Sequence, residues 1–433
     1  MTDRNRNILY FGIMALLFCA VGLFQSWSLS LAILNLCLIS AIMSMGVNMQ
    51  WGYAGLLNVG VMGFAALGGI TAVLVSIPAV PEAIDAGGNG ILMAFLIVAL
   101  FIIAIVAAYR FIPPPFRAWI IAVIVLVGLY IFRGLFDPAV ALIEAVNPAG
   151  TGNLGGLGLP IILSWLLGGV VAAIAAWGVG KISLGLRSDY LAIATLGISE
   201  IIISILKNED WLTRGVKNVS GLPRPVPYEV NLQKSEEFIA WANWLGADVQ
   251  EFSSIFVKLC YASLFLIVLL ALLWLSEKAL NSPWGRMMRA IRDNEDAAEA
   301  MGKDVTHRHL MIFIIGSAVI GIAGAMLTTL DGQFTPTSYQ PLRFTFLIWV
   351  MVIVGGSGNN WGAILGGFVI WFFWIQAEPM GLWLMDVITS GMPEGSGLRE
   401  HLLKSAAHMR LMTMGVILLL VLRFAPRGLI PER

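Results

Sequence analysis

The sequence is poor in charge and in cysteine, and each shortage narrows the classes of protein to which the chain can belong. Charged residues make up only 12% of the 433 residues, and 26 basic and 26 acidic side chains give a formal net charge of +0. This balance gives no indication of a nucleic-acid partner. The three cysteines, Cys19, Cys37 and Cys260, all lie in apolar runs. We therefore expect buried thiols and no disulfide framework.

The residue groupings that carry enzyme chemistry are also missing. The segment GVGKIS at 178–183 resembles a phosphate-binding loop, but Ile182 stands where the magnesium-binding hydroxyl belongs, and Ala175 stands where the first glycine belongs. His307 and His309 point away from each other on a helix and have no third ligand nearby in the sequence. We expect no catalytic residues, no metal and no cofactor, and we expect that the chain does not hydrolyse ATP itself.

Hydrophobic residues, in contrast, make up 58% of the chain. They gather in long runs, and a run of about 20 apolar residues is what an α-helix needs to cross a bilayer. We therefore predict an all-α fold, a polytopic transmembrane helical bundle of about 10–12 spans, with 1–433 forming a single transmembrane domain. One or two spans could be re-entrant or broken, and the run 53–77 is rich in glycine. The expected spans are 8–24, 27–49, 53–77, 91–110, 117–135, 160–180, 187–206, 255–275, 309–330, 342–357, 361–378 and 411–423.

Lysine and arginine predict the orientation of the bundle, because they gather on cytoplasmic loops. With both termini in the cytoplasm, the most basic loop, 276–308, lies inside, and two long loops, near 207–254 and 379–410, lie outside. These outer loops could form a cap that meets a soluble partner or could be solvated connectors. The first run follows Arg4 and Arg6, as in a signal peptide, but no cleavage site of small residues stands out, so we expect a retained anchor.

The cytoplasmic loop contains a short polar helix whose ends are marked in the sequence. Asp293 and Asn294 are good N-caps, and two acidic residues follow at the positive end of the helix dipole. Gly302 suits the left-handed residue that ends a helix. A helix over roughly 294–301 is marginal on its own in water. It must therefore be held by its own protein or by a partner.

The middle of this helix has little side-chain bulk, because Ala297, Ala298 and Ala300 occupy it. Small residues let a helix enter a groove and bring its backbone close to the groove wall, and Met301 adds a flexible apolar contact. One interpretation is therefore a helix that docks into a partner. An ordinary solvated helix at the membrane surface is the other.

Several polar or small residues inside the apolar runs are candidates for a translocation path or for helix packing. Glu200 is the strongest candidate, because an ionisable residue within a membrane costs free energy and is usually functional. Lys258 could neutralise it in a structural ion pair. Glycines at high density suit close helix packing or a broken helix that lines a cavity. The candidates are Asn35, Gly52, Gly55, Asn58, Thr195, Glu200 and Lys258.

The pattern D-A-A-x-x-x-G, formed by Asp296, Ala297, Ala298 and Gly302, resembles the Glu-Ala-Ala loop of ABC importer permeases. In that family the loop forms a coupling helix that docks into a cleft of the ATP-binding subunit. This chain has Asp where most members have Glu, and it lacks the Leu-Pro pair that follows in many of them. The resemblance assigns the coupling role to Glu295, Asp296, Ala297, Ala298, Glu299, Ala300 and Gly302.

Further blocks resemble the M-type permease of branched-chain amino-acid importers and occur in the order typical of that family. The region 78–150 departs from the pattern, because it is longer than the usual family core and could hold accessory helices. The blocks are GYAGLLNVGVMGFAALGGITA (52–72), GLRSDYLAIATLGISEI (185–201), SPWGRMMRAIRDNEDAAEAMG (282–302), GIAGAMLTTLDGQFTP (321–336), GGSGNNWGAILGG (355–367) and FAPRGLIPE (424–432).

The resemblance implies a transmembrane subunit of an ATP-driven importer for branched-chain or hydrophobic amino acids in a bacterial inner membrane. It also implies a homologous second permease subunit, two cytoplasmic ATP-binding subunits and an extracytoplasmic substrate-binding protein as partners, besides membrane lipid. A urea or short-amide importer of the same family is a close rival to this interpretation. An ion-coupled secondary transporter that uses Glu200 is a rival from a different class of protein, as is a membrane scaffold without transport.

Overall fold

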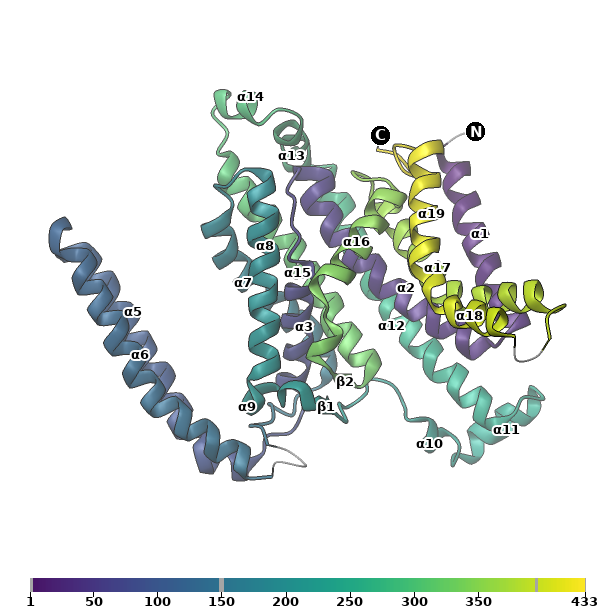
Figure 1. The fold of residues 1–433 in the computed structure, drawn as a ribbon, viewed down its shortest axis with the longest axis horizontal. Helices are drawn as coiled ribbons and strands as arrows, with labels where there is room; N and C mark the ends of the chain where they lie inside the picture. Colours follow the sequence, from purple (N-terminus) through teal and green to yellow (C-terminus); the bar gives the residue numbers. More distant parts are fainter. Residues whose placement is uncertain (1–2, 148–151, 394–395, 433) are drawn as a thin grey trace.

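The computed structural model describes residues 3–147, 152–393 and 396–432 (Figure 1). These residues are mostly helical, and the one sheet among them is a pair of two-residue strands. The elements, in order, are α1 (Asp3–Phe24), α2 (Trp27–Val47), the π-helical turn η1 (Asn48–Gly52), α3 (Val61–Ser76), α4 (Pro81–Ala83), η2 (Ile84–Gly88), α5 (Asn89–Phe111), α6 (Pro114–Ala145), α7 (Ile161–Ser183), α8 (Ser188–Asn208), α9 (Asp210–Thr213), η3 (Gly215–Lys217), β1 (Val219–Ser220), α10 (Glu229–Leu232), α11 (Glu236–Trp244), α12 (Val249–Leu280), α13 (Pro283–Asp293), α14 (Glu295–Ala300), α15 (Val305–Asp331), β2 (Gln333–Phe334), η4 (Pro336–Ser338), α16 (Pro341–Gly355), α17 (Asn360–Thr389), α18 (Gly397–Ser405), η5 (Ala406–His408) and α19 (Met409–Phe424).

The predicted membrane spans correspond to helices. Within the described residues, nine helices are long and apolar enough to cross a bilayer, and α18 with α19 forms one further candidate that is bent by 59°. α3 and α16 are apolar but shorter, with 16 and 15 residues. Each predicted run thus lies wholly or partly on a helix, and the chain is an all-α, multi-pass membrane protein, as predicted. The run 53–77 is broken, since its helix begins only at Val61.

α2 and α15 form the centre of the bundle. In their most apolar stretches 78% and 67% of the residues are buried, against 6% for α6. α15 packs against α7, α3 and α2. Small residues allow the close approach, because Gly321 of α15 lies against Gly168 of α7 and Gly68 of α3, where an added Cβ would collide with the opposite backbone.

α5 and α6 pack on each other as a hairpin that stands apart from the bundle (Figure 1). Its base is held by an apolar cluster that includes Ala83, Ile143 and Trp211. Most of its large apolar side chains are exposed, so its surface suits contact with lipid. α6 extends well past the predicted end near 135, and an ion pair between Arg133 and Asp137 at 3.3 Å spans that point. The last residues of the region 78–150, 148–150, lie outside the described part.

The two ends of the bundle differ in what they carry. The start of α1, the end of α19 and α14 lie at one end, whereas β1, α10 and α11 lie at the other (Figure 1). β1 and β2 pair antiparallel, with Val219 opposite Phe334, and this pair ties the segment 207–254 to the end of α15. The segments predicted to face the cytoplasm therefore share one end, and 207–254 lies at the opposite end. Which end faces the cytoplasm stays a prediction.

Candidate functional site at the coupling loop and the helix break

The short polar helix forms as the sequence predicts. α14 spans Glu295–Ala300, and the Asn294 side chain accepts a hydrogen bond from the Ala297 backbone N–H at 2.9 Å. Gly302 has φ +76°, and the Lys303 N–H donates to the Ala298 carbonyl at 3.2 Å, which closes the helix end. One detail differs, because Asp293 is the last residue of α13 and Asn294 alone caps α14.

α14 projects from the bundle and keeps most of its surface free. None of its residues is buried, and Met301 directly after it is 80% exposed. Ala297 and Ala300 are exposed, whereas Ala298 is half-buried and packs against the main apolar core. The three alanines therefore do not share one role, because Ala298 rests on its own chain and the other two remain available to a partner.

α13 connects α14 to the bundle through Arg292. The buried face of α13 contains Gly285, Met288 and Ile291, and Arg292, near its end, is half-buried against the bundle. The Arg292 guanidinium donates to the Gly52 carbonyl and to the Glu432 carboxylate, the latter at 2.9 Å. This one side chain, next to α14 in the sequence, thus contacts the end of η1 and the C-terminal segment.

The charge of Arg292 is well stabilised. Burial alone would lower the pKa of its guanidinium, but hydrogen bonds and charge from Glu432 and Asp293 outweigh burial, so the pKa is raised. The guanidinium therefore stays protonated at any physiological pH. Arg292 and Glu432 line an open cleft of about 670 Å³ that also includes Arg289 and Arg427.

The chain between α2 and α3 is a break in a helix, held by buried amides. Gln50 is fully buried, and its amide donates to the Phe313 carbonyl at 2.9 Å and to the Ser317 hydroxyl at 3.0 Å. The Asn58 amide donates to the Gln50 side-chain oxygen at 2.9 Å. Non-helical backbone at membrane depth persists only where its polar groups find partners. The Asn58 side chain supplies one such partner, Gln50 anchors that side chain to α15, and Gly55 takes the left-handed turn at φ +72°.

The candidates Gly52, Gly55, Asn58 and Thr195 all lie at this break. The Thr195 hydroxyl accepts a hydrogen bond from the Val59 N–H at 3.0 Å, which fixes the unwound segment to α8. The Asn58 carbonyl accepts from the Trp349 indole N–H at 3.0 Å, and its side-chain oxygen accepts from the Gly60 N–H. The structure thus gives these four residues a common location at the helix break.

Asn35 and Lys258 lie elsewhere, at the contact between α2 and α12. The Asn35 amide donates to the Lys258 carbonyl at 3.0 Å, and the Lys258 ammonium donates to the Ser28 carbonyl at 3.2 Å. The predicted neutralisation of Glu200 by Lys258 is wrong. Glu200 lies on α8, makes no ion pair with any described residue, and lines an open groove of about 620 Å³ beside Lys207 and Arg343.

Sequence reasoning missed the residues that connect the coupling loop to the break. Arg292 and Glu432 are 140 positions apart, and nothing local in the sequence indicates their contact. Gln50 and Asn48 could have been recognised as candidates from the sequence, because they are amides inside an apolar run. Asn48 donates to the Asn360 side chain at 3.2 Å, and Asn360 in turn donates to Glu277 at 3.1 Å.

Comparison with known proteins places this sequence in a family. A family model described as "Branched-chain amino acid transport system / permease component" matches residues 121–422. A probable branched-chain amino acid transport permease protein LivM of Methanocaldococcus jannaschii is 29% identical over 283 residues, which cover 65% of this chain and 70% of that protein. The high-affinity branched-chain amino acid transport system permease protein LivM of Salmonella typhimurium is 30% identical over 207 residues, or 47% of this chain and 48% of that protein.

A similarity also extends to a second type of permease. A probable branched-chain amino acid transport permease protein LivH of Methanocaldococcus jannaschii is 30% identical over 115 residues, which cover 27% of this chain and 35% of that protein. The chain spans about half the length of the bacterial LivM relative that it matches. No solved structure matches the chain significantly. The matched family consists of transport permeases rather than enzymes, and its model covers well over half of the sequence, so the chain belongs to the family of branched-chain amino-acid transport permease components.

Proposed function

We propose that the chain is the transmembrane subunit of an ATP-driven importer for branched-chain or other hydrophobic amino acids. Its partners would be a homologous second permease, two cytoplasmic ATP-binding subunits and an extracytoplasmic substrate-binding protein. The membrane would be a bacterial inner membrane, with both termini and the loop 276–308 in the cytoplasm. The observation that carries the proposal is α14, a capped helix that lies outside the bundle with exposed alanines.

The link from α14 into the bundle supports a mechanical role. When the ATP-binding subunits close on ATP, they would shift α14 and the adjoining α13. Arg292 would pass this shift to the Gly52 carbonyl and to Glu432, since it contacts both. The break between α2 and α3 is a stretch of core backbone that is not helical. Its rearrangement would turn the pathway from inward-facing to outward-facing and admit substrate from the binding protein.

ATPase measurements on purified components test this proposal. The chain alone should hydrolyse no ATP, because its only resemblance to a nucleotide loop lacks the required residues. The complex with the second permease and the ATP-binding subunits should hydrolyse ATP, and leucine-loaded binding protein should accelerate the reaction. ATP hydrolysis by the chain alone would overturn the proposal.

A further inference from the structure

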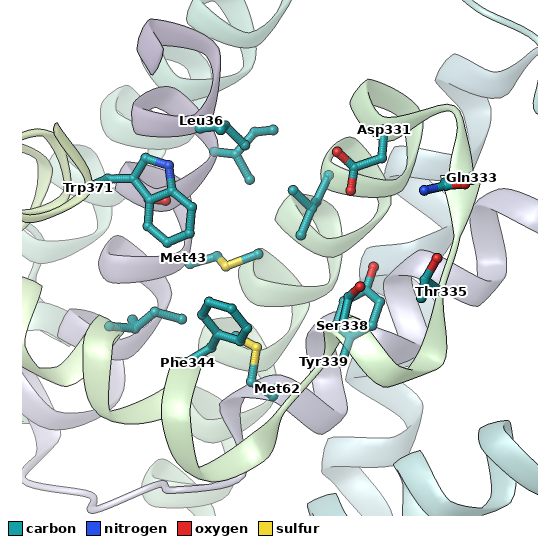
Figure 2. Close-up of a pocket in the computed structure, with 14 residues that line it drawn as sticks. Leu36, Met43, Met62, Asp331, Gln333, Thr335, Ser338, Tyr339, Phe344 and Trp371 are labelled. Atoms are coloured by element: carbon teal, nitrogen blue, oxygen red, sulfur yellow. The ribbon is translucent and has the colours of Figure 1, made fainter. Parts of the chain in front are cut away.

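A second cavity lies at the end of α15 that is opposite to α14. It has a volume of about 240 Å³ and is enclosed by α2, α3, α15, α16 and α17 together with the segment from β2 to η4 (Figure 2). Figure 2 shows two unlike walls. Asp331, Gln333, Thr335, Ser338 and Tyr339 form a polar wall, and the facing wall includes Leu36, Met43, Met62, Phe344 and Trp371.

The carboxylate of Asp331 has no compensating charge from the described residues of its own chain. It makes no ion pair with any described residue, and its side chain is accessible from the cavity. Asp331 is also the last residue of α15, where the helix dipole places partial negative charge. A carboxylate in that position is destabilised twice, by the helix end and by the apolar surroundings. A cation that enters the cavity would relieve both effects.

Two further polar atoms at the cavity lack partners. The Thr335 hydroxyl and the Trp371 indole nitrogen are buried, and neither makes a hydrogen bond within the described residues. Buried polar groups are paired in the great majority of cases, so each exception calls for an explanation. The Tyr339 hydroxyl differs, because it is paired with the Thr328 hydroxyl at 2.8 Å. The cavity therefore has an unpaired indole donor across from Asp331 (Figure 2).

From this arrangement we infer that the cavity is a binding site for a small α-amino acid with an apolar side chain. The ammonium group would donate to Asp331, with the Thr335 hydroxyl as a further acceptor. The carboxylate would accept from the Trp371 indole N–H, and the side chain would pack on Met43, Met62 and Phe344. A cavity of about 150 Å³ accommodates benzene, so about 240 Å³ suits a branched aliphatic side chain together with its two charged groups. The choice of amino acids as ligands rests on the proposed function.

Equilibrium binding to the purified full-length chain in lipid nanodiscs tests the inference with three probes. L-Leucine carries both charged groups, 3-methylbutylamine lacks the carboxylate, and 4-methylpentanoate lacks the amine. Wild type should bind leucine and the amine more tightly than the acid. Asp331→Asn should weaken binding of leucine and the amine by on the order of tenfold to a hundredfold, since the carboxylate makes a charged hydrogen bond. Glu237→Gln removes an exposed carboxylate on α11 and is the matched control.

Trp371→Phe gives a second and independent readout, because it keeps an aromatic ring at this wall and removes the N–H donor. This variant should weaken leucine binding by about tenfold and leave binding of 3-methylbutylamine unchanged. Equal loss for both probes, or no loss, would overturn the inference even if Asp331→Asn failed to fold. Equal leucine binding by Asp331→Asn and Glu237→Gln would overturn it as well, and so would binding of 4-methylpentanoate as tight as that of leucine.

Different experimental results would contradict the inferred binding site and the proposed function. If leucine binding depends on Asp331 but the complete complex shows no ATP-driven leucine uptake, the site stands and the proposed function is wrong. If the complex imports leucine equally with wild-type chain and with Asp331→Asn, the function stands and the site is wrong.

Discussion

The Arg292 guanidinium lies 2.9 Å from the Glu432 carboxylate and also donates a hydrogen bond to the Gly52 carbonyl. Gly52 is the last residue of the π-helical turn that ends α2, and Arg292 is one residue from the end of α13. The contact thus joins the base of the coupling loop to the place where the central helix breaks. A force applied to α14 has a direct covalent and hydrogen-bonded route to that break.

Removing this link should uncouple ATP hydrolysis from transport. Arg292→Ala deletes the charged hydrogen bonds to Gly52 and Glu432, at a cost of about 1.5–3 kcal/mol for a charged partner. We expect the variant to insert and to retain the ATP-binding subunits, because α14 is intact, but to lose most substrate uptake per ATP hydrolysed. The measurement is the ratio of uptake to hydrolysis in proteoliposomes.

Arg286→Ala is the matched control for that experiment, because Arg286 is exposed on the same helix and, among the described residues, makes only a long contact to the Asn281 carbonyl at 3.4 Å. It should keep the wild-type ratio. If the two alanine variants behave alike, Arg292 carries no coupling and another contact must do so.

Bulk on the exposed face of α14 should weaken docking of the ATP-binding subunit. Ala300→Leu adds volume where a close contact is proposed, and overpacking typically costs about 1–3 kcal/mol, so affinity should fall roughly fivefold or more. Glu299→Lys changes charge at a solvated position and should have a smaller effect. Titration of the purified ATP-binding subunit onto nanodisc-embedded chain measures both. Wild-type affinity for Ala300→Leu would show that this face of α14 is merely solvated.

The buried amide of Gln50 should be essential for the stability of the break. Gln50→Leu leaves the Asn58 amide without its acceptor and deletes the side-chain bonds to α15, and an unsatisfied buried group costs about 1–3 kcal/mol. The variant should unfold at a clearly lower temperature in detergent. Gln250→Leu, at an exposed position near the start of α12, should leave the unfolding temperature nearly unchanged. Equal unfolding temperatures for the two variants would contradict the role given to Gln50.

The orientation can be tested by single-cysteine labelling. In a background where Cys19, the exposed native cysteine, is replaced by alanine, a cysteine at Ala300 should react only with reagent on the cytoplasmic side. A cysteine at Ser220, exposed in β1, should react only from outside. The expectation follows from the enrichment of lysine and arginine in cytoplasmic loops. Reversed labelling would show that the orientation in the membrane is opposite to the predicted one.

Local features of this protein were predictable from the sequence, whereas long-range contacts were not. α14 was predicted because Asn294 and Gly302 act on their own neighbours, and the membrane helices were predicted because each reads as one apolar run. Arg292 and Glu432 are brought together only by tertiary packing. The pairing of Glu200 with Lys258 failed for the same reason, since hydrophobicity alone does not say that α12 packs beside α2.

The position of the helix break was predicted from the sequence, but the contacts that hold it were not. The glycines and Asn58 marked a break in an apolar run, and the structure adds the amides and the indole that hold the break together. The cavity at Asp331 was not predicted, because its walls come from five helices and a loop that are distant in sequence. Such a set of residues has no common pattern along the chain.

Uptake of radiolabelled leucine into proteoliposomes is the most direct test of the central claim, that a separate ATPase drives transport through this chain. The liposomes would hold the chain, the second permease and the ATP-binding subunits, with binding protein outside, ATP inside and no ion gradient. The proposal predicts accumulation of leucine that requires ATP and ceases when the ATP-binding subunits are omitted. Accumulation by the chain alone, without ATP and driven by a proton gradient, would contradict it.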